Sequence, residues 1–103
     1  MRRQIVYLPA VRHDFVEALN YYDTLSPKLG NTFRDEFRRA EQSIEAGFVT
    51  HKVVFQHYHR VLFRRYPYTL YYRVTDGRAV IVGLLYSRLA PETVKSALTF
   101  RTP

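Results

Sequence analysis

The chain has 103 residues, of which 47% are hydrophobic and 16% aromatic, with 16 Lys and Arg against 9 Asp and Glu and no Cys. This composition is typical of one folded domain over residues 1–103, and it excludes a disulfide scaffold, a thiolate metal site and a disordered tail. No apolar run approaches the roughly 18 residues of a membrane span and no secretory signal peptide is recognisable, so we expect a cytoplasmic protein without membrane association.

The first predicted elements are a short strand and a helix. Residues 4–8 are rich in β-branched and aromatic side chains and end at Pro9, whose fixed φ suits the start of a helix. Residues 10–25 then repeat apolar side chains at intervals of three and four, which predicts a helix with one apolar face: Val11, Phe15, Ala18, Leu19 and Tyr22.

A second helix is predicted from Pro27 to about Ala46. Ser26 has the side chain of an N-cap, Pro27 fits the first helical position, and Gly47 is a typical C-terminal stop. The apolar face of this helix consists of Leu29, Phe33, Phe37, Ala40 and Ile44. The side predicted to face solvent carries mixed charges: Arg34, Asp35, Arg38, Glu41 and Glu45.

Three strands are predicted in the second half of the chain, over residues 59–66, 68–75 and 78–86. Pro67 ends the first of them. An Asp-Gly pair between the other two is a strong signal of a tight hairpin, which pairs antiparallel strands. The last strand is almost continuously aliphatic, as expected of a central strand that is buried on both faces.

Two weaker elements complete the predicted fold. Residues 48–58 resemble a loop with a short strand over residues 52–55, and Pro91 opens a short C-terminal helix to about Leu98. The predicted fold class is therefore α+β, in the order β-α-α-β-β-β, with a helical hairpin packed on a small antiparallel sheet.

The positive charge is concentrated in the second half of the chain. Residues 1–46 contain equal numbers of basic and acidic side chains, so residues 47–103 account for the whole net charge of +7. Most of the cations are Arg, whose planar fork pairs with phosphates and carboxylates. A solubilising surface and a binding face for nucleic acid or an acidic protein both explain this distribution.

Arginines on the predicted strands are the candidate binding residues. Strand alternation places Arg60 and Arg64 on one face of the first strand, and Tyr71 and Arg73 on one face of the next, which predicts an exposed face of arginine and tyrosine. The alternatives are a sheet face that binds nothing and an ion pair between Arg73 and Asp76. The candidate set is Arg64, Arg65, Arg73, Tyr86 and Arg88.

Motifs for catalysis, metals and cofactors are scarce. The four glycines are too scattered for a phosphate-binding loop, and a nucleophile elbow is missing. His57 and His59 would share one strand face near His51, but the segment has no third close metal ligand, so we interpret these as loop histidines. We therefore predict no cofactor and no metal site, and the only catalytic candidate, if the chain is a nuclease, is Arg88.

Residues 64–74, with the sequence Arg-Arg-Tyr-Pro-Tyr-Thr-Leu-Tyr-Tyr-Arg-Val, resemble the RelE/ParE superfamily of bacterial toxins. They match the ParE-like, plasmid-stabilisation branch, whose pattern is a basic residue, an aromatic, Pro-Tyr, two variable positions and Tyr-Arg-Val. Residues 9–14 match the start of the family's first helix, and residues 85–88 occupy the place of its final-strand signature. The resemblance covers about residues 4–92.

The resemblance implies the toxin of a type II toxin–antitoxin module, which inhibits DNA gyrase by binding and is neutralised by a cognate antitoxin, as a homodimer or in a heterotetramer. RelE-like members instead cut messenger RNA on the ribosome. Thr69 and Val94 stand where that branch places an arginine and a tyrosine, which favours the ParE-like side, although Arg88 matches both. A ribosome-dependent endoribonuclease and an inactive member that acts as a protein-binding adaptor are the alternatives.

Overall fold

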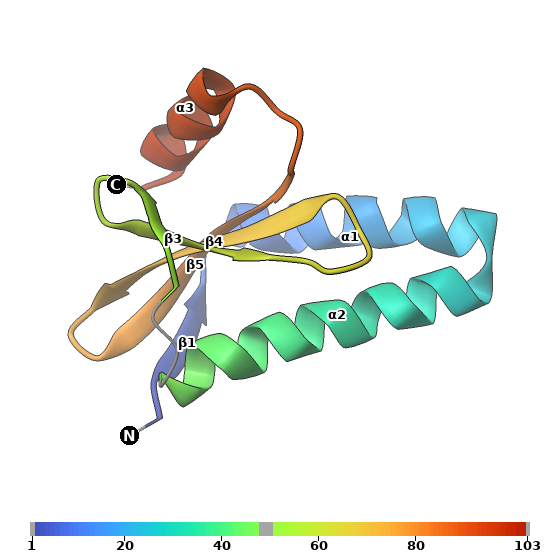
Figure 1. Cartoon of the computed structure of the whole chain (residues 1–103), viewed down its shortest axis with the longest axis horizontal. Helices are drawn as coiled ribbons and strands as arrows, with labels where there is room; N and C mark the ends of the chain where they lie inside the picture. Colours follow the sequence, from blue (N-terminus) through green and yellow to red (C-terminus); the bar gives the residue numbers. More distant parts are fainter. Residues whose placement is uncertain (1, 48–50, 103) are drawn as a thin grey trace.

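The computed structural model describes residues 2–47 and 51–102. Its elements in chain order are β1 (Gln4–Tyr7), α1 (Pro9–Leu25), α2 (Pro27–Ala46), β2 (Val53–Phe55), β3 (Tyr58–Leu62), β4 (Tyr68–Thr75), β5 (Arg78–Tyr86) and α3 (Pro91–Arg101). Figure 1 shows the α1–α2 hairpin on one side of the sheet and α3 on the other. The α+β class is confirmed, β2 lies within the short strand expected over residues 52–55, and α3 is longer than predicted. None of the described helices is long and apolar enough to cross a bilayer.

The five strands form one sheet in the order β1-β5-β4-β3-β2. The strands from β2 to β5 pair antiparallel, as predicted. The purely antiparallel prediction is wrong at the opposite edge, where β1 pairs parallel with β5 from Gln4↔Arg78 to Tyr7↔Ile81. A parallel pair requires a long crossover, and the two helices and three strands between β1 and β5 provide it.

Local signals fix the ends of α2 and the tight turn of the sheet. The side chain of Ser26 accepts a hydrogen bond from the backbone N–H two residues later, Pro27 begins the helix, and Gly47 ends it with a φ of 72°. In the β4–β5 turn Asp76 and Gly77 have φ values of 52° and 74°, which this kind of hairpin requires. The predicted bounds of α2 and the predicted hairpin are confirmed.

The main core lies between the helical hairpin and the sheet. Phe33 of α2 is fully buried, and its ring centroid lies 5.2 Å from those of both Tyr22 and Tyr66. Of the residues predicted for the two apolar helix faces, only Leu29 is exposed. It lies at the connected end of the hairpin, which extends beyond the sheet (Figure 1), so no strand covers it.

A second core lies under α3, on the other face of the sheet. Leu98 of α3 packs with four buried side chains from the strands: Tyr58, Tyr71, Val82 and Leu85. Because only 7% of Tyr71 is exposed, the predicted open face of arginine and tyrosine is wrong here. The helix covers that face instead.

An ion pair lies along the part of β5 that extends beyond the end of β1. The carboxylate of Asp14 accepts hydrogen bonds from the Arg101 guanidinium at 2.5 and 2.9 Å, and one from the backbone N–H of Leu84 at 3.0 Å. Arg101 also donates to the carbonyl of Val82 at 3.2 Å. A Cβ added to Gly83 would lie 2.9 Å from Arg101 Nη1, so glycine leaves room for the guanidinium. This pair joins α3 to α1.

Candidate functional site

Arg64 and Arg65 lie in a loop rather than on a strand. β3 ends at Leu62, so the strand predicted to continue beyond it is wrong. The residues on either side of the two arginines, Phe63 and Tyr66, are both buried in the main core. Residues three apart cannot point to the same face of a regular strand, so the chain must leave the pleated geometry here. The Tyr66 hydroxyl also donates to a backbone carbonyl in the first turn of α2, at 2.8 Å.

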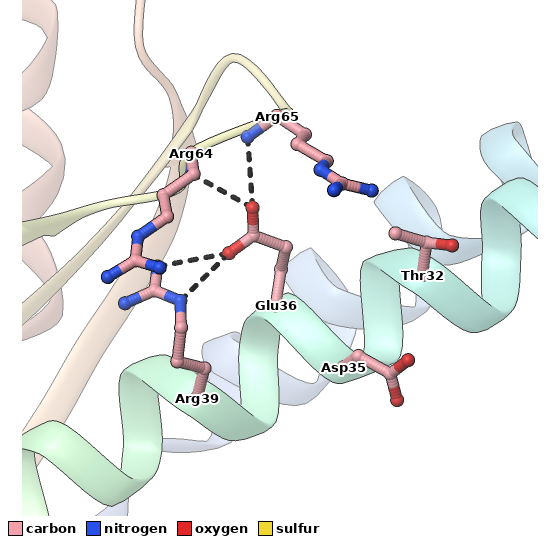
Figure 2. Close-up of a pocket in the computed structure, with 6 residues that line it drawn as sticks. All are labelled: Thr32, Asp35, Glu36, Arg39, Arg64 and Arg65. Atoms are coloured by element: carbon pink, nitrogen blue, oxygen red, sulfur yellow. Dashed lines mark hydrogen bonds and ion pairs between the residues drawn. The ribbon is translucent and has the colours of Figure 1, made fainter.

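The carboxylate of Glu36, on α2, binds the backbone of the same loop. Oε1 of Glu36 accepts hydrogen bonds from the backbone N–H groups of Arg64 and Arg65, at 3.0 and 2.9 Å (Figure 2). Oε2 of Glu36 accepts one from Nε of Arg39 at 3.1 Å and pairs with its Nη2 at 3.0 Å. We call residues 63–67 the arginine loop and Glu36 its anchor.

Glu36 is ionised although only 7% of the residue is exposed. Burial raises its pKa, but the hydrogen bonds from the backbone of Arg65, the side chain of Arg39 and the backbone of Arg64 outweigh this effect. The pKa of Glu36 is therefore lowered from its ordinary value of 4.5. The anchor stays charged throughout the neutral range.

An open pocket of about 300 Å³ lies beside the anchor and is lined by Thr32, Asp35, Glu36, Arg39, Arg64 and Arg65. Arg65 extends toward Thr32, whereas Asp35 directs its carboxylate away from the arginines (Figure 2). Among residues 2–47 and 51–102, the side chains of Arg64, Arg65 and Asp35 have no hydrogen-bond or ion-pair partner. Their charges face solvent.

Tyr86 and Arg88 lie at the same end of the sheet as the arginine loop. Tyr86, the last residue of β5, pairs with Tyr68, and the backbone N–H of Ser87 donates to the carbonyl of Pro67 at 2.7 Å. Both Tyr86 and Arg88 are exposed. The structure thus brings four of the five candidate residues to one end of the sheet.

Arg73 does not belong to this group. It lies farther along β4, opposite Val80, and is half-buried. In the described part of the chain no ion pair joins Arg73 to Asp76, and the buried Nε of Arg73 has no hydrogen-bond partner. Its place in the candidate set therefore stays a prediction, and the structure shows only that Arg73 lies apart from the other four residues.

A second concave region lies between α3 and the sheet, and the sequence did not predict it. This cleft has a volume of about 190 Å³ and is lined by Val54, Phe55, Arg60, Tyr71, Ser87, Leu89, Pro91, Val94 and Lys95. Burial raises the pKa of Tyr71, opposed by its hydrogen bond to Thr69 and by the charge of Arg60. Arg60, Ser87 and Lys95 are far apart in the sequence. The pairing of the strands and the packing of α3 across the sheet bring them together in the fold.

The histidines form a polar contact rather than a ligand set. Nδ1 of His51 lies 2.5 Å from the Tyr72 hydroxyl, and the ring of His59 stacks on Tyr72 at 5.0 Å. Burial lowers the pKa of His51, with further contributions from His59 and Arg3. His57 lies in the β2–β3 turn and does not share a strand face with His59, contrary to the alternation considered above. Within the described residues no three His, Cys, Asp or Glu side chains are placed to hold a metal ion.

No protein-family model matches the chain, and a search of curated proteins finds no significant match. The resemblance to RelE/ParE toxins therefore stays a prediction that rests on the motifs of the sequence. Among the residues that form the candidate site, Glu36 and Arg39 were not predicted. A signal for Glu36 is present, since a carboxylate three residues after Phe33 and four before Ala40 lies on the apolar stripe of the helix.

Proposed function

We propose that this chain is the toxin of a ParE-like toxin–antitoxin module, which acts in the cytoplasm by binding its target and is neutralised by a cognate antitoxin. The observation that carries this proposal is the arginine loop. The residues that carry the family resemblance also build a rigid surface with two outward-facing guanidinium groups. DNA gyrase is the target that the resemblance favours.

The geometry of the loop supports binding in preference to chemistry. The lining of the pocket beside Arg64 and Arg65 includes no histidine. Its two carboxylates do not face each other as an acid–base pair would. Both oxygens of Glu36 accept hydrogen bonds, and the carboxylate of Asp35 points away from the arginines. A fixed cationic surface recognises acidic groups without the need for proton transfer.

The cleft beneath α3 favours the alternative of an endoribonuclease. Arg60 and Lys95 place two cations near the hydroxyl groups of Tyr71 and Ser87. Cations can stabilise the charge that develops on a phosphodiester, and a hydroxyl can take part in proton transfer. In this alternative the cleft is the active site and messenger RNA is the substrate; Arg88 lies between two lining residues, Ser87 and Leu89, but does not line the cleft itself.

Controlled expression in a bacterial host tests the proposal. We expect growth arrest that co-expression of the neighbouring gene product relieves, inhibition of DNA supercoiling by purified gyrase, and intact messenger RNA in translation extracts. Cleaved messenger with unimpaired gyrase would favour the endoribonuclease. Unaffected growth, gyrase and messenger would leave the protein-binding adaptor as the function.

A further inference from the structure

The pocket beside Glu36 contains two arginines and an aspartate whose side chains have no partners among residues 2–47 and 51–102. Arg64 and Arg65 are exposed, and among the described residues neither side chain makes a hydrogen bond or an ion pair. Asp35 on the rim of the same pocket is equally unpartnered in that part of the chain. Arg39 contributes a third guanidinium from the pocket wall.

We propose that this pocket binds carboxylate side chains of an acidic segment in a partner protein, with Arg64 and Arg65 as the contact residues and Glu36 as a positioning residue. The inference rests on the proposed function only in taking the partner to be a protein. It adds the place where the partner binds, the chemistry of the contact and the group that organises it.

The fixed backbone of the loop is the first reason. Two backbone N–H groups converge on one carboxylate oxygen, and the flanking Phe63 and Tyr66 are only 7% exposed. The backbone of Arg64 and Arg65 is therefore attached to the core on both sides and through Glu36. A contact surface that is already ordered loses less conformational entropy when it binds.

The mixed charge of the pocket is the second reason, and it favours a protein over a nucleic acid. Asp35 also lines the pocket, although its carboxylate is directed away from the arginines (Figure 2), so a phosphate backbone that extended from Arg64 and Arg65 across the rim would approach a like charge, and like charges repel. A protein segment can place a glutamate or aspartate against the arginines and a lysine against Asp35. The planar guanidinium also matches a carboxylate in a two-hydrogen-bond geometry.

Fluorescence anisotropy with the full chain tests this inference. The probe is a labelled peptide of alternating glutamate and leucine with one lysine near its end, and single-stranded RNA and inorganic phosphate are the competitors. We expect the peptide to bind, and the double substitution Arg64→Gln/Arg65→Gln to weaken binding about tenfold. Arg78→Gln is the matched control, since Arg78 is equally exposed but lies at the β4–β5 turn, and it should leave the affinity unchanged.

A charge swap makes the result specific to the pocket. Arg64→Glu/Arg65→Glu should lose the glutamate peptide and gain a peptide with lysine in place of glutamate. Equal weakening by the Arg78 control, or no gain of the lysine peptide, would overturn the proposal. Displacement of the peptide by RNA at a lower concentration than by unlabelled peptide would overturn it in favour of a nucleic-acid site.

The positioning role of Glu36 must be tested by a measurement that a loss of folding stability alone does not change. In Glu36→Gln the two arginines remain but the loop loses its charged anchor, so we expect weaker peptide binding at a temperature where circular dichroism shows the variant to be folded. Unchanged affinity would remove Glu36 from the proposal. The growth assay distinguishes the proposed function from the proposed pocket. Growth arrest and its relief without any peptide binding would refute the pocket but support the toxin function. Peptide binding without growth arrest would support the pocket but refute the toxin function.

Discussion

A carboxylate removed from water is stable only where hydrogen bonds replace its hydration, and Glu36 meets this condition with donors from two elements. Two backbone N–H groups of the arginine loop and the side chain of Arg39 saturate both oxygens. A single side chain in the helix layer therefore determines the conformation of a surface loop. Sequence reasoning did not select this residue, although it lies on the apolar stripe, because a glutamate within a charged helix is ordinarily assigned to solvent.

The lowered pKa of Glu36 gives a prediction for stability against pH. We expect Glu36→Gln to lower the free energy of unfolding by about 1–3 kcal/mol at neutral pH, because the amide cannot accept from all of the donors. The stabilisation by the carboxylate is full above the unfolded-state pKa, near 4.5, and is lost as pH falls through the lower folded-state pKa. Urea denaturation at neutral and acidic pH should therefore show the difference between wild type and variant shrinking in acid.

Glu41 provides a control of opposite sign on the same helix. Burial and the nearby Glu45 raise its pKa, so the ionised form is disfavoured in the folded state. Glu41→Gln should not destabilise the protein at neutral pH. An equal loss of stability in both variants would contradict the anchor role of Glu36.

His51 gives a second pH-dependent prediction, in a different range. Its pKa is lowered from 6.5 by burial first and then by His59 and Arg3, so the unfolded chain binds the proton more readily. Stability should therefore fall as pH decreases from about 6.5 toward the folded-state pKa of His51. In His51→Gln this slope should flatten, while His57→Gln, in the exposed β2–β3 turn, should retain it. Thermal melts across this range would measure both slopes.

At the scale of elements, the α1–α2 hairpin depends on the close approach of its two helices at Gly30. A Cβ at this position would lie 1.6 Å from Oδ1 of Asp23, which also pairs with Arg34 at 3.8 Å. The obstacle is the end of a side chain that can rotate at the cost of its pair with Arg34, so we expect Gly30→Ala to destabilise the protein by no more than about 1 kcal/mol. In an Asp23→Ala background the obstacle is absent, and the same substitution should be neutral or stabilising by up to about 1 kcal/mol. Chemical denaturation of the four proteins measures this coupling; additive effects would contradict it.

The attachment of α3 depends on the pair between Asp14 and Arg101. Their side chains are only 9% and 20% exposed, so removing one leaves the other poorly compensated. We expect Asp14→Ala to lower the free energy of unfolding by about 2–3 kcal/mol and to speed amide hydrogen exchange in α3. The pair of Lys95 and Glu92 on the outside of the same helix is the control, and Glu92→Gln should change stability by less than about 0.5 kcal/mol. Slow exchange in α3 of Asp14→Ala would show that apolar packing alone holds the helix.

The elements that sequence reasoning predicted well are those with strong local signals. Pro27, Gly47 and the Asp76-Gly77 turn act through the φ angles of single residues, so a pattern of neighbours suffices to place them. The end of β3 depends instead on Phe63 and Tyr66 reaching one core, which is a tertiary requirement. Likewise the burial of Tyr71 follows from α3, whose own pattern does not indicate which face of the sheet it covers.

For the whole molecule, the net charge of +7 proved to be a poor guide to position. The arginines of residues 47–103 are dispersed: Arg64 and Arg65 lie in the arginine loop, Arg60 lines the cleft beneath α3, Arg101 pairs with Asp14, Arg73 is half-buried, and Arg78 and Arg88 are exposed elsewhere. The predicted exposed face of arginine and tyrosine is not found on the described strands, because β3 ends before Arg64 and α3 covers the face that contains Tyr71. The α+β architecture and the order of its main elements could be predicted, whereas the partners of each charge could not.

The position of β5 determines when the arginine loop, the proposed binding surface, becomes ordered during synthesis. β1 is translated first, but its neighbour in the sheet is β5, which is translated after both helices and three other strands. The α1–α2 hairpin likewise has no complete sheet to pack on until β5 has emerged from the ribosome. The arginine loop is translated before β5, yet it is ordered by α2 and by the core that β5 completes. A translation product that stops before β5 would therefore carry both arginines without presenting them in a fixed arrangement, and the loop would become ordered only after β5 has been made.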